Sequence, residues 1–557
     1  MDKGKILEVI GLSVEFPTRQ GVVQAAKDVC FELHSGRTLG IVGESGSGKS
    51  VSALSVMRLL PAGKCTLRGQ ILLSDGSGGA PLPLHQLHEP EMQQIRGRRI
   101  GMIFQEPMSS LNPVFRCGDQ ITESLRLHLK LDARAATERT LEWFDKVQLS
   151  DPARIFKSFP HQLSGGQKQR VMIAMALCCQ PDLLIADEPT TALDVTVQKA
   201  ILDLIRELQD NTGAACLFIS HDLGVISELA HEVAVMHQGV MVETGQVEEV
   251  FRHPQHPYTK GLIACRPPLY KRLHRLPVVA DFLSPDAATP EAMVAAPRII
   301  DQTTPLLDVR HVSVRYPGRP PVQALSEASF VLYPGETMGI VGESGSGKTT
   351  LGRALLRLVD AQSGEAWYQG QNLLALSEAS LRSLRRDIQM IFQDPYSALN
   401  PRHSIGRAIM EPMQWHGICR NAAEGKEQTI ELLRTVGLGP EYFDRYPHEL
   451  SGGQRQRACI ARALSVRPRL LICDESVSAL DVSVQAQVLN LLQDLRDAQG
   501  LSMIFISHDI SVIRQISDRV LVMKDGRIVE SGSTDDVCSH PQSDYTRQLM
   551  DAVPGKW

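Results

Sequence analysis

Two glycine-rich segments carry residues of the types that cradle nucleotide phosphates. They are Gly43-Glu44-Ser45-Gly46-Ser47-Gly48-Lys49-Ser50 and Gly342-Glu343-Ser344-Gly345-Ser346-Gly347-Lys348-Thr349. Both match the pattern G-x-x-x-x-G-K-[ST], in which glycines let backbone N–H groups close around phosphates. We expect Lys49 and Lys348 to reach the outer phosphates, and we expect the hydroxyls of Ser50 and Thr349 to bind Mg²⁺.

An acidic pair closes an apolar run in each half of the chain. The pairs are Asp187-Glu188 and Asp474-Glu475, each preceded by four apolar residues, which disfavours a simple surface charge. The aspartates suit a Mg²⁺ contact, and the glutamates suit a general base that orients an attacking water.

Glutamine and histidine side chains complete both sets. Gln105 and Gln393 follow the runs Met-Ile-Phe, and an amide there can contact both the metal and the water. His221 and His508 follow apolar runs in the context Ile-Ser-His-Asp. A lone histidine there would usually be structural, but the matched repeat favours a contact to the γ-phosphate.

A second anion-binding pattern precedes a helical pattern in each half. It reads Ser164, Gly165, Gly166, Gln167 in the first copy and Ser451, Gly452, Gly453, Gln454 in the second. A serine with small residues at a helix start is an anion site. Because each half already has one phosphate cradle, we expect this one to serve the nucleotide held by the other half.

The repeat defines the domain organisation. The Leu-Ser-Gly-Gly-Gln runs, the acidic pairs and the histidines all recur at a spacing of 287 residues, whereas the glycine-rich loops are 299 residues apart. The first half therefore holds extra residues, which we place in a surface loop over 74–83. We predict a first domain over 1–264, a Pro/Ala-rich linker over 265–305, and a second domain over 306–557.

Each half alternates strand-like and helix-like patterns. Residues 38–42, 183–186 and 216–219 read as buried strands, and 51–60 has helical spacing. Chemistry-bearing residues follow the ends of these strands, which is typical of an open parallel sheet. The expected fold class is α/β.

Composition excludes several function classes. The formal net charge of −5 gives no overall case for nucleic-acid binding. None of the 11 cysteines lies at C-x-x-C spacing, so we predict neither a zinc site nor a disulfide framework. Charges interrupt the N-terminal apolar residues, so no signal peptide is expected. The longest apolar run, 171–179, is too short to span a bilayer.

With these residues assembled, the chain resembles the ATP-binding cassette (ABC) ATPases over nearly its whole length, as two cassettes in tandem. The resemblance implies, in each cassette, an α/β core, an antiparallel β subdomain and a helical subdomain. It also implies two ATP molecules, with Mg²⁺, buried between cassettes that pair head to tail. The Mg²⁺ contacts would be Ser50, Asp187, Gln105, Thr349, Asp474 and Gln393, and the hydrolytic residues would be Glu188, Glu475, His221, His508, Gln105 and Gln393. Phe16 and Tyr316 match the aromatic that stacks on adenine, the alternative being an aromatic on a strand face.

Finer features resemble the oligopeptide/dipeptide importer branch. They are the extended segments at 105–113 and 393–401, and the motif at 253–259 with a looser copy at 540–546. We read the histidines of that motif as part of a structural turn rather than a metal site. The resemblance implies the ATP-hydrolysing subunit of an importer for peptides or glutathione, on the cytoplasmic face of the bacterial inner membrane. Its partners would be two integral-membrane permease subunits and, indirectly, an extracytoplasmic substrate-binding protein, with no nucleic acid.

Alternatives and departures remain at this stage. The substrate could be another solute (nickel, a sugar or an opine), and a tandem-cassette translation factor is a more distant alternative. Ser476 stands where the first half has Pro189. Many relatives carry a four-cysteine iron–sulfur cluster, which is not predicted because only Cys265 and Cys538 lie in the linker and tail. The arginines at 96, 98, 99, 382, 385 and 386 are read as a solvated face or a docking patch.

Overall fold

The computed structural model describes residues 4–555 except 19–20, 62, 75–79, 106–109, 191–192, 285–292, 297, 319–320 and 479. Half of the loop predicted over 74–83 and part of the linker therefore lie outside the described residues. In the described part, no helix combines the length and the apolar character needed to span a bilayer.

The first half contains ten strands and eleven helices within the described residues. The strands are β1 Lys5–Thr18, β2 Gly21–His34, β3 Thr38–Val42, β4 Thr66–Leu73, β5 Leu82–Pro83, β6 Ile100–Ile103, β7 Leu183–Asp187, β8 Ala215–Ser220, β9 Glu232–His237 and β10 Val240–Gln246. The helices are α1 Lys49–Val56, α2 Glu89–Ile95, α4 Cys117–Leu129, α5 Ala133–Lys146, α6 Pro152–Lys157, α7 Gly165–Leu177, α8 Val195–Thr212, α9 Leu223–Leu229, α10 Val247–Arg252, α11 Pro257–Ala264 and α12 Ala280–Leu283.

The second half repeats this order. Its strands are β11 Leu307–Tyr316, β12 Val322–Leu332, β13 Thr337–Val341, β14 Ser363–Tyr368, β15 Gln371–Asn372, β16 Ile388–Ile391, β17 Leu470–Asp474, β18 Ser502–Ser507, β19 Arg519–Lys524 and β20 Arg527–Ser533. Its helices are α13 Lys348–Leu355, α14 Glu378–Leu384, α15 Pro395–Ala398, α16 Ile405–Trp415, α17 Ala422–Thr435, α18 Gly452–Leu464, α19 Val482–Gln499, α20 Ile510–Ile516, α21 Thr534–Ser539 and α22 Asp544–Ala552.

Each half has two sheets, which confirms the predicted α/β class. In the first half the orders are β2-β1-β4-β5, antiparallel, and β10-β9-β3-β8-β7-β6, in which all strands but β10 run parallel. Parallel pairing aligns Val42 with Ser220 and Asp187 with Ile219. The carboxyl ends of β3, β6, β7 and β8 therefore meet at one edge, where open α/β sheets bind ligands.

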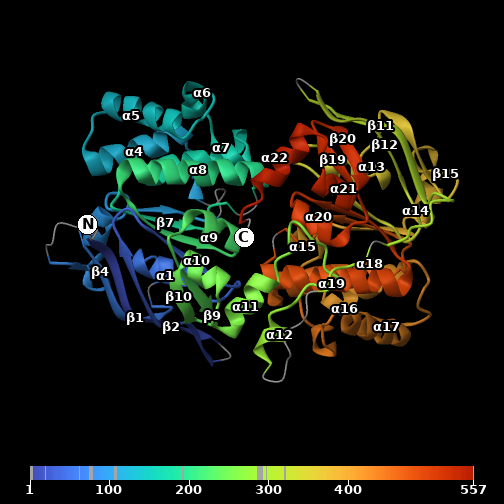
Figure 1. Cartoon of the computed structure of the whole chain (residues 1–557), viewed down its shortest axis with the longest axis horizontal. Coiled ribbons are helices and arrows are strands. Elements are labelled where there is room, and N and C mark those ends of the chain that lie inside the picture. The colour runs from blue at the N-terminus through green and yellow to red at the C-terminus, as the bar shows by residue number, and fades with distance from the viewer. Residues whose placement is uncertain are drawn as a thin grey trace.

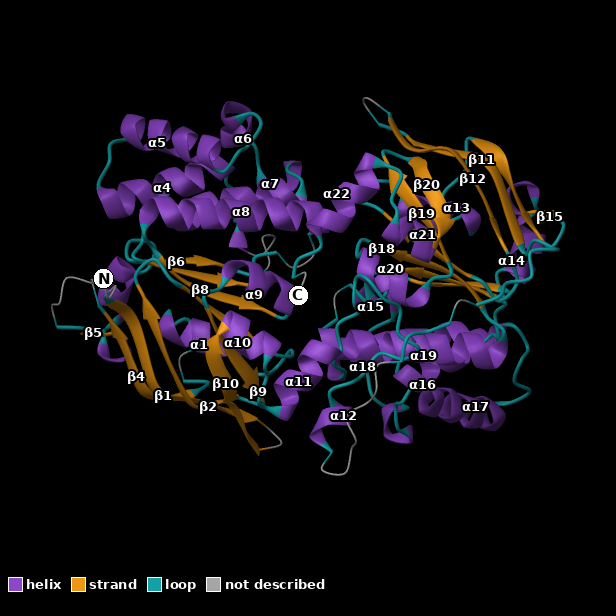
Figure 2. Cartoon of the chain, viewed as in Figure 1, coloured by secondary structure: helices purple, strands orange, loops and turns teal. Residues whose placement is uncertain are grey.

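The two halves lie side by side in opposite orientations (Figures 1 and 2). Helices α4 to α6 lie at the top of the first half, whereas α16 and α17 lie at the bottom of the second. At the junction, α22 of the second half packs against α8 of the first. This inverted placement brings corresponding loops of the two halves toward one another.

The segment predicted as a linker is docked on the second half where it is described. Leu273 and Leu276 are buried, and their N–H groups donate to Gln515 at 3.1 Å and to Asn490 at 2.9 Å. Arg272 pairs with Asp518 at 3.4 Å. The connection is therefore fixed to the second half over residues 272–276, which we call the strap.

Two local predictions differ from the structure. The helix expected over 51–60 ends at Val56, because Arg58 adopts a left-handed conformation (φ 50°) that no α-helix continues through. The arginines read as a solvated face or docking patch mostly brace the fold. Arg96, Arg98 and Arg385 donate to backbone carbonyl oxygens, and Arg99 pairs with Asp182 at 2.8 Å.

Candidate functional site

Each glycine-rich loop connects a central parallel strand to a helix that starts at its lysine. Gly43, at φ 152°, is wedged against β9, where a Cβ atom would lie 2.2 Å from the Met236 carbonyl oxygen. Lys49 Nζ donates to the carbonyl oxygens of Gly43 at 2.8 Å and Glu44 at 2.9 Å. The loop is thus closed around its own lysine, as glycine-rich loops close around a phosphate.

The second loop repeats this geometry closely. Lys348 Nζ donates to Gly342 at 2.7 Å and to Glu343 at 2.8 Å. Burial lowers the pKa of both lysines, although nearby carboxylates oppose that effect. A buried cation held by carbonyl groups is ready to exchange them for an anionic phosphate.

The hydroxyl after each lysine bonds to the aspartate at the end of the adjacent strand. Ser50 donates to Asp187 Oδ1 at 2.9 Å, and Thr349 donates to Asp474 Oδ1 at 2.8 Å. Burial raises the pKa of Asp187 to about 6 and also raises that of Asp474. Asp474 Oδ2 is buried with no hydrogen-bond partner among the described residues. Hydroxyl and carboxylate oxygens with free coordination capacity fit Mg²⁺.

Glu188 lies at the meeting point of the first site. Its Oε2 accepts a hydrogen bond from Gln105 at 3.1 Å and lies 3.1 Å from His221 Nδ1. Burial alone would lower the pKa of His221, but Glu188 and nearby aspartates raise it. Sequence reasoning proposed these three residues as one group, and the structure brings them together.

The second site contains the same group with different spacings. Gln393 donates to Glu475 Oε2 at 2.7 Å, His508 Nδ1 lies 3.8 Å from that atom, and Lys348 Nζ lies 3.8 Å from Oε1. Burial alone would raise the pKa of Glu475, but these neighbours hold it below its ordinary value. The carboxylate is therefore ionised near neutral pH, as a general base must be.

Both glutamates have an unusual backbone conformation. Glu188 has φ 46° and Glu475 has φ 45°, in the left-handed region that non-glycine residues seldom occupy. Each follows the last residue of a buried strand, β7 or β17, so the turn aims the side chain across the strand ends. Such outliers concentrate at functional sites.

The Ser-Gly-Gly-Gln segments begin helices α7 and α18. Ser164 and Ser451 are exposed, and their hydroxyls accept the N–H groups of Gln167 and Gln454 at 3.3 Å. These side chains cap their own helices. Donation of each serine to the nucleotide of the opposite half stays a prediction.

At the glycine-rich loops, the contacts that cross between the halves come instead from the N-terminal ends of α8 and α19, which sequence reasoning did not assign. The Asp481 carboxylate accepts the backbone N–H of Ser45, and Ser483 donates to Glu44. In the mirror position, Thr196 donates to Glu343 Oε1 at 2.6 Å. The repeated Ala-Leu-Asp-Val at 192–195 and 479–482 was the available sequence signal.

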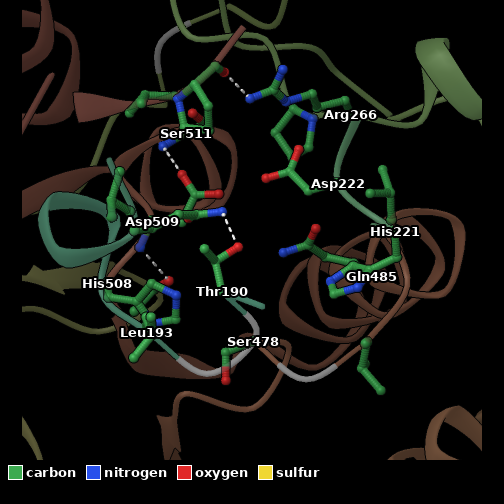
Figure 3. A pocket seen from close by; sticks show the side chains of 18 of the residues that line it. Thr190, Leu193, His221, Asp222, Arg266, Ser478, Gln485, His508, Asp509 and Ser511 are labelled. Atoms are coloured by element: carbon green, nitrogen blue, oxygen red, sulfur yellow. Dashed lines mark hydrogen bonds between the residues drawn. The ribbon is translucent and has the colours of Figure 1, made fainter. Parts of the chain in front are cut away.

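A cavity of about 110 Å³ lies between the two halves (Figure 3). His221 and His508 face it from opposite sides, and Asp222 and Asp509 line it as well. Each aspartate caps the helix that follows its histidine. The two histidine loops therefore share one solvent-sized space, so a movement of one loop changes the surroundings of the other.

Phe16 lies near the end of β1, and Tyr316 is the last residue of β11, in the two antiparallel sheets. Both are partly buried, and the Tyr316 hydroxyl lies 3.4 Å from Thr350 Oγ1, next to the second glycine-rich loop. Adenine stacking on these rings stays a prediction.

Comparison with known families and proteins adds to this geometry. The family model described as ABC transporter matches residues 26–191 and 325–478, and the model of the oligopeptide/dipeptide transporter C-terminal region matches 242–287 and 529–556. The chain is 49% identical to the glutathione import ATP-binding protein GsiA of Pectobacterium atrosepticum, over 99% of this chain and 90% of that protein. It is 47% identical to the Escherichia coli K12 protein of the same name, over 100% of this chain and 90% of that protein.

Among solved structures, a dimeric bacterial ABC transporter cassette is 28% identical, with a TM-score of 0.39. The match spans 41% of the present chain and 98% of the cassette in that structure.

Proposed function

Because the chain belongs to the ABC transporter family and carries two of its ATPase cassettes, we propose that it is the energy-coupling subunit of a bacterial importer for peptides or glutathione. The relatives at 47% to 49% identity are named for glutathione import, and both halves match the oligopeptide/dipeptide C-terminal region. No residue described above selects a cargo. The substrate class therefore rests on these relatives.

The main support for ATP hydrolysis at two sites is the duplicated cluster of side chains around Glu188 and Glu475. At the first site, Gln105 and His221 hold the glutamate where it can orient a water and accept its proton. Ser50 and Asp187 would hold Mg²⁺, which would supply neutralisation of the phosphate charge. Lys49 leaves its own loop carbonyls and pairs with phosphate oxygens.

We propose that the Ser-Gly-Gly-Gln segments complete these sites in the ATP-bound state. Their serines are exposed at the N-termini of thirteen-residue helices, α7 and α18, whose positive ends favour phosphate. The crossing contacts at Glu44 and Glu343, each made with a helix start of the opposite half, support this pairing. Closure on ATP and opening after hydrolysis would then be a rigid-body movement of the halves.

Exposed apolar side chains support docking to permease subunits. In the second half, a groove of about 650 Å³ is lined by residues that include Leu358, Phe392, Pro412 and Trp415. The Trp415 side chain is 73% exposed, and its counterpart in the first half, Leu127, is 70% exposed. The same helix position is thus apolar and exposed in both halves, as expected of a repeated interaction surface, and in the second half it borders an apolar groove. We propose that these residues dock on two integral-membrane permease subunits, that the chain works at the cytoplasmic face of the bacterial inner membrane, and that an extracytoplasmic binding protein is an indirect partner.

Uptake assays test this proposal. The chain is expressed with the permease and binding-protein genes adjacent to its own, in cells that lack glutathione import, and uptake of radiolabelled glutathione, a dipeptide, nickel and a sugar is compared. Glutathione or peptide uptake that disappears in the Glu188→Gln/Glu475→Gln variant supports the proposal. ATP-dependent uptake of nickel or the sugar alone would overturn the substrate class.

A further inference from the structure

The C-terminal motif of each half forms a clamped turn. In the first copy, the Glu243 carboxylate on β10 accepts the N–H groups of Gln255 at 2.7 Å and His256 at 3.0 Å. His256 Nδ1 then accepts the N–H of Tyr258 at 3.1 Å and caps α11. The histidine is therefore a helix cap, and the clamp fixes the direction in which the next side chain, Tyr258, points.

The second copy keeps the clamp and replaces the cap. Glu530 on β20 accepts the N–H groups of Gln542 at 2.8 Å and Ser543 at 3.0 Å. Ser543 takes the place of the histidine and caps α22, accepting the N–H of Tyr545 at 3.2 Å. What the two copies share is the glutamate, the turn and the tyrosine.

Both tyrosines reach the glycine-rich loop of their own half. The Tyr258 hydroxyl accepts the backbone N–H of Glu44 at 3.1 Å and donates to Glu44 Oε2 at 3.3 Å. The Tyr545 hydroxyl accepts the backbone N–H of Glu343 at 3.0 Å. The rings are 0% and 6% exposed. Burial raises the pKa of Tyr258 and raises that of Tyr545 to about 12, so both hydroxyls stay protonated near neutral pH.

Equivalent residues at the end of β9 and β19 hold the rings in place. The His237 ring centroid lies 4.0 Å from that of Tyr258, and Lys524 Nζ lies 4.8 Å from the centroid of Tyr545. Two different contacts thus preserve one ring position, which indicates that the position of the hydroxyl matters more than the packing partner.

The residue that each tyrosine holds is also the one that meets the opposite half. The Glu44 carboxylate accepts the Ser483 hydroxyl, and Glu343 Oε1 accepts the Thr196 hydroxyl at 2.6 Å. The Glu44 carbonyl is one of the two groups that bind Lys49. One residue therefore connects the C-terminal motif, the phosphate-binding lysine and the other half.

We propose that Tyr258 and Tyr545 are positioning residues of the two ATP sites. Each hydroxyl fixes the second residue of its phosphate-binding loop, Glu44 or Glu343. The loop therefore keeps its shape when its lysine moves from the loop carbonyl groups to ATP. The glutamate side chain also stays aligned with the hydroxyl that it binds on the opposite half. This inference rests on ATP binding by the loops, the first step of the proposed function.

The first test is nucleotide affinity at one site of the full-length chain. Lys348→Ala disables the second site, and a fluorescent ATP analogue reports binding at the first. Tyr258→Phe keeps the ring and removes the hydroxyl, so we expect about fivefold weaker binding, equivalent to ~1 kcal/mol for one hydrogen bond. Tyr368→Phe is the matched control, because that tyrosine is buried and its hydroxyl has no partner among the described residues. The melting temperature of both variants should lie within about 4 °C of the parent's, the change expected for a loss of ~1 kcal/mol in the free energy of unfolding.

A double-mutant cycle separates positioning from simple packing. If Tyr258 acts through Glu44, its effect on affinity is non-additive with that of Ser483→Ala and additive with that of Thr196→Ala, which contacts the other site. Unchanged affinity in Tyr258→Phe, or additivity with both partners, overturns the inference. Tyr545→Phe in a Lys49→Ala chain, paired with Thr196→Ala, repeats the test if Tyr258→Phe does not fold. Absence of binding by the unmodified first site would instead refute the proposed function.

Discussion

Burial of the charged Asp187 carboxylate should lower the free energy of unfolding of the nucleotide-free chain. A substitution that removes this charge should raise the free energy of unfolding. The side chain is 5% exposed, and burial raises its pKa from 3.8 to about 6. This difference corresponds to ~3 kcal/mol of free energy of unfolding. Asp187→Asn keeps the shape and an oxygen that can accept from Ser50, so we expect the variant to be more stable by up to that amount, roughly 5–10 °C in melting temperature.

The sign and the pH window follow from the same shift. Because the folded-state pKa lies above the unfolded one, protonation favours folding, and this contribution is lost as the pH rises from about 4 to 6. The stability difference between Asp187→Asn and the parent should therefore be small near pH 4 and complete above pH 6.5.

The assay is thermal unfolding of the full chain across pH 4–8 without nucleotide. Asp203→Asn, an exposed position on α8, is the matched control and should show no such pH-dependent difference. With Mg²⁺ and ATP the order should reverse, because the parent gains stability from the metal that the asparagine variant binds poorly. A parent that is more stable than Asp187→Asn at pH 7.5 without nucleotide would refute the burial argument.

Three further predictions concern turnover, closure and docking. Glu188→Gln and Glu475→Gln should each slow hydrolysis at their own site by roughly 10²–10⁴-fold, which single-turnover assays can measure; loss from only one of them would contradict two competent sites. A crystal structure of the double Gln variant with ATP should place the Ser451 hydroxyl at the phosphates in the first site, and a solvent-facing serine would contradict closure. Trp415→Ala should weaken co-purification with the permease by about tenfold and leave the basal ATPase rate unchanged, with Leu127→Ala as the equivalent test on the other half.

The sequence predicted which candidate residues lie close together where their positions depend on local backbone geometry. A glycine-rich loop between a buried strand and a helix has one way to close, and the acidic pairs follow strands whose ends meet in any parallel sheet of this order. The clustering of Gln105, Glu188 and His221 followed from their positions after three such strands. The left-handed conformation of Glu188 did not, because it depends on how the turn packs.

The contacts between the halves could not be read in advance. Asp481 and Ser483 lie in an ordinary helix-start pattern, and what makes them part of the first site is the inverted placement of the second half. Tyr258 was visible only as part of a repeated turn motif. Its contact with Glu44 spans 214 residues and depends on the hairpin of β9 and β10 that carries the clamp.

Fusion of two cassettes in one chain has a physical consequence for how the sites open and close. The strap after α11 is fixed to the second half through Leu273 and Leu276, and Arg266 binds the carbonyl groups of the C-terminal Pro554 and Gly555. The Gly555 N–H also donates to Glu228 on α9 at 3.2 Å, and Gln515 on α20 accepts the Leu273 N–H, so the tail of each half contacts the helix that follows the histidine loop of the other. Such tethering raises the effective concentration of one half at the other, so reopening after hydrolysis need not separate them. In the proposed cycle, the crossing contacts at Glu44 and Glu343 would then act as the pivot of the rigid-body movement by which ATP brings the serine segments onto the phosphates.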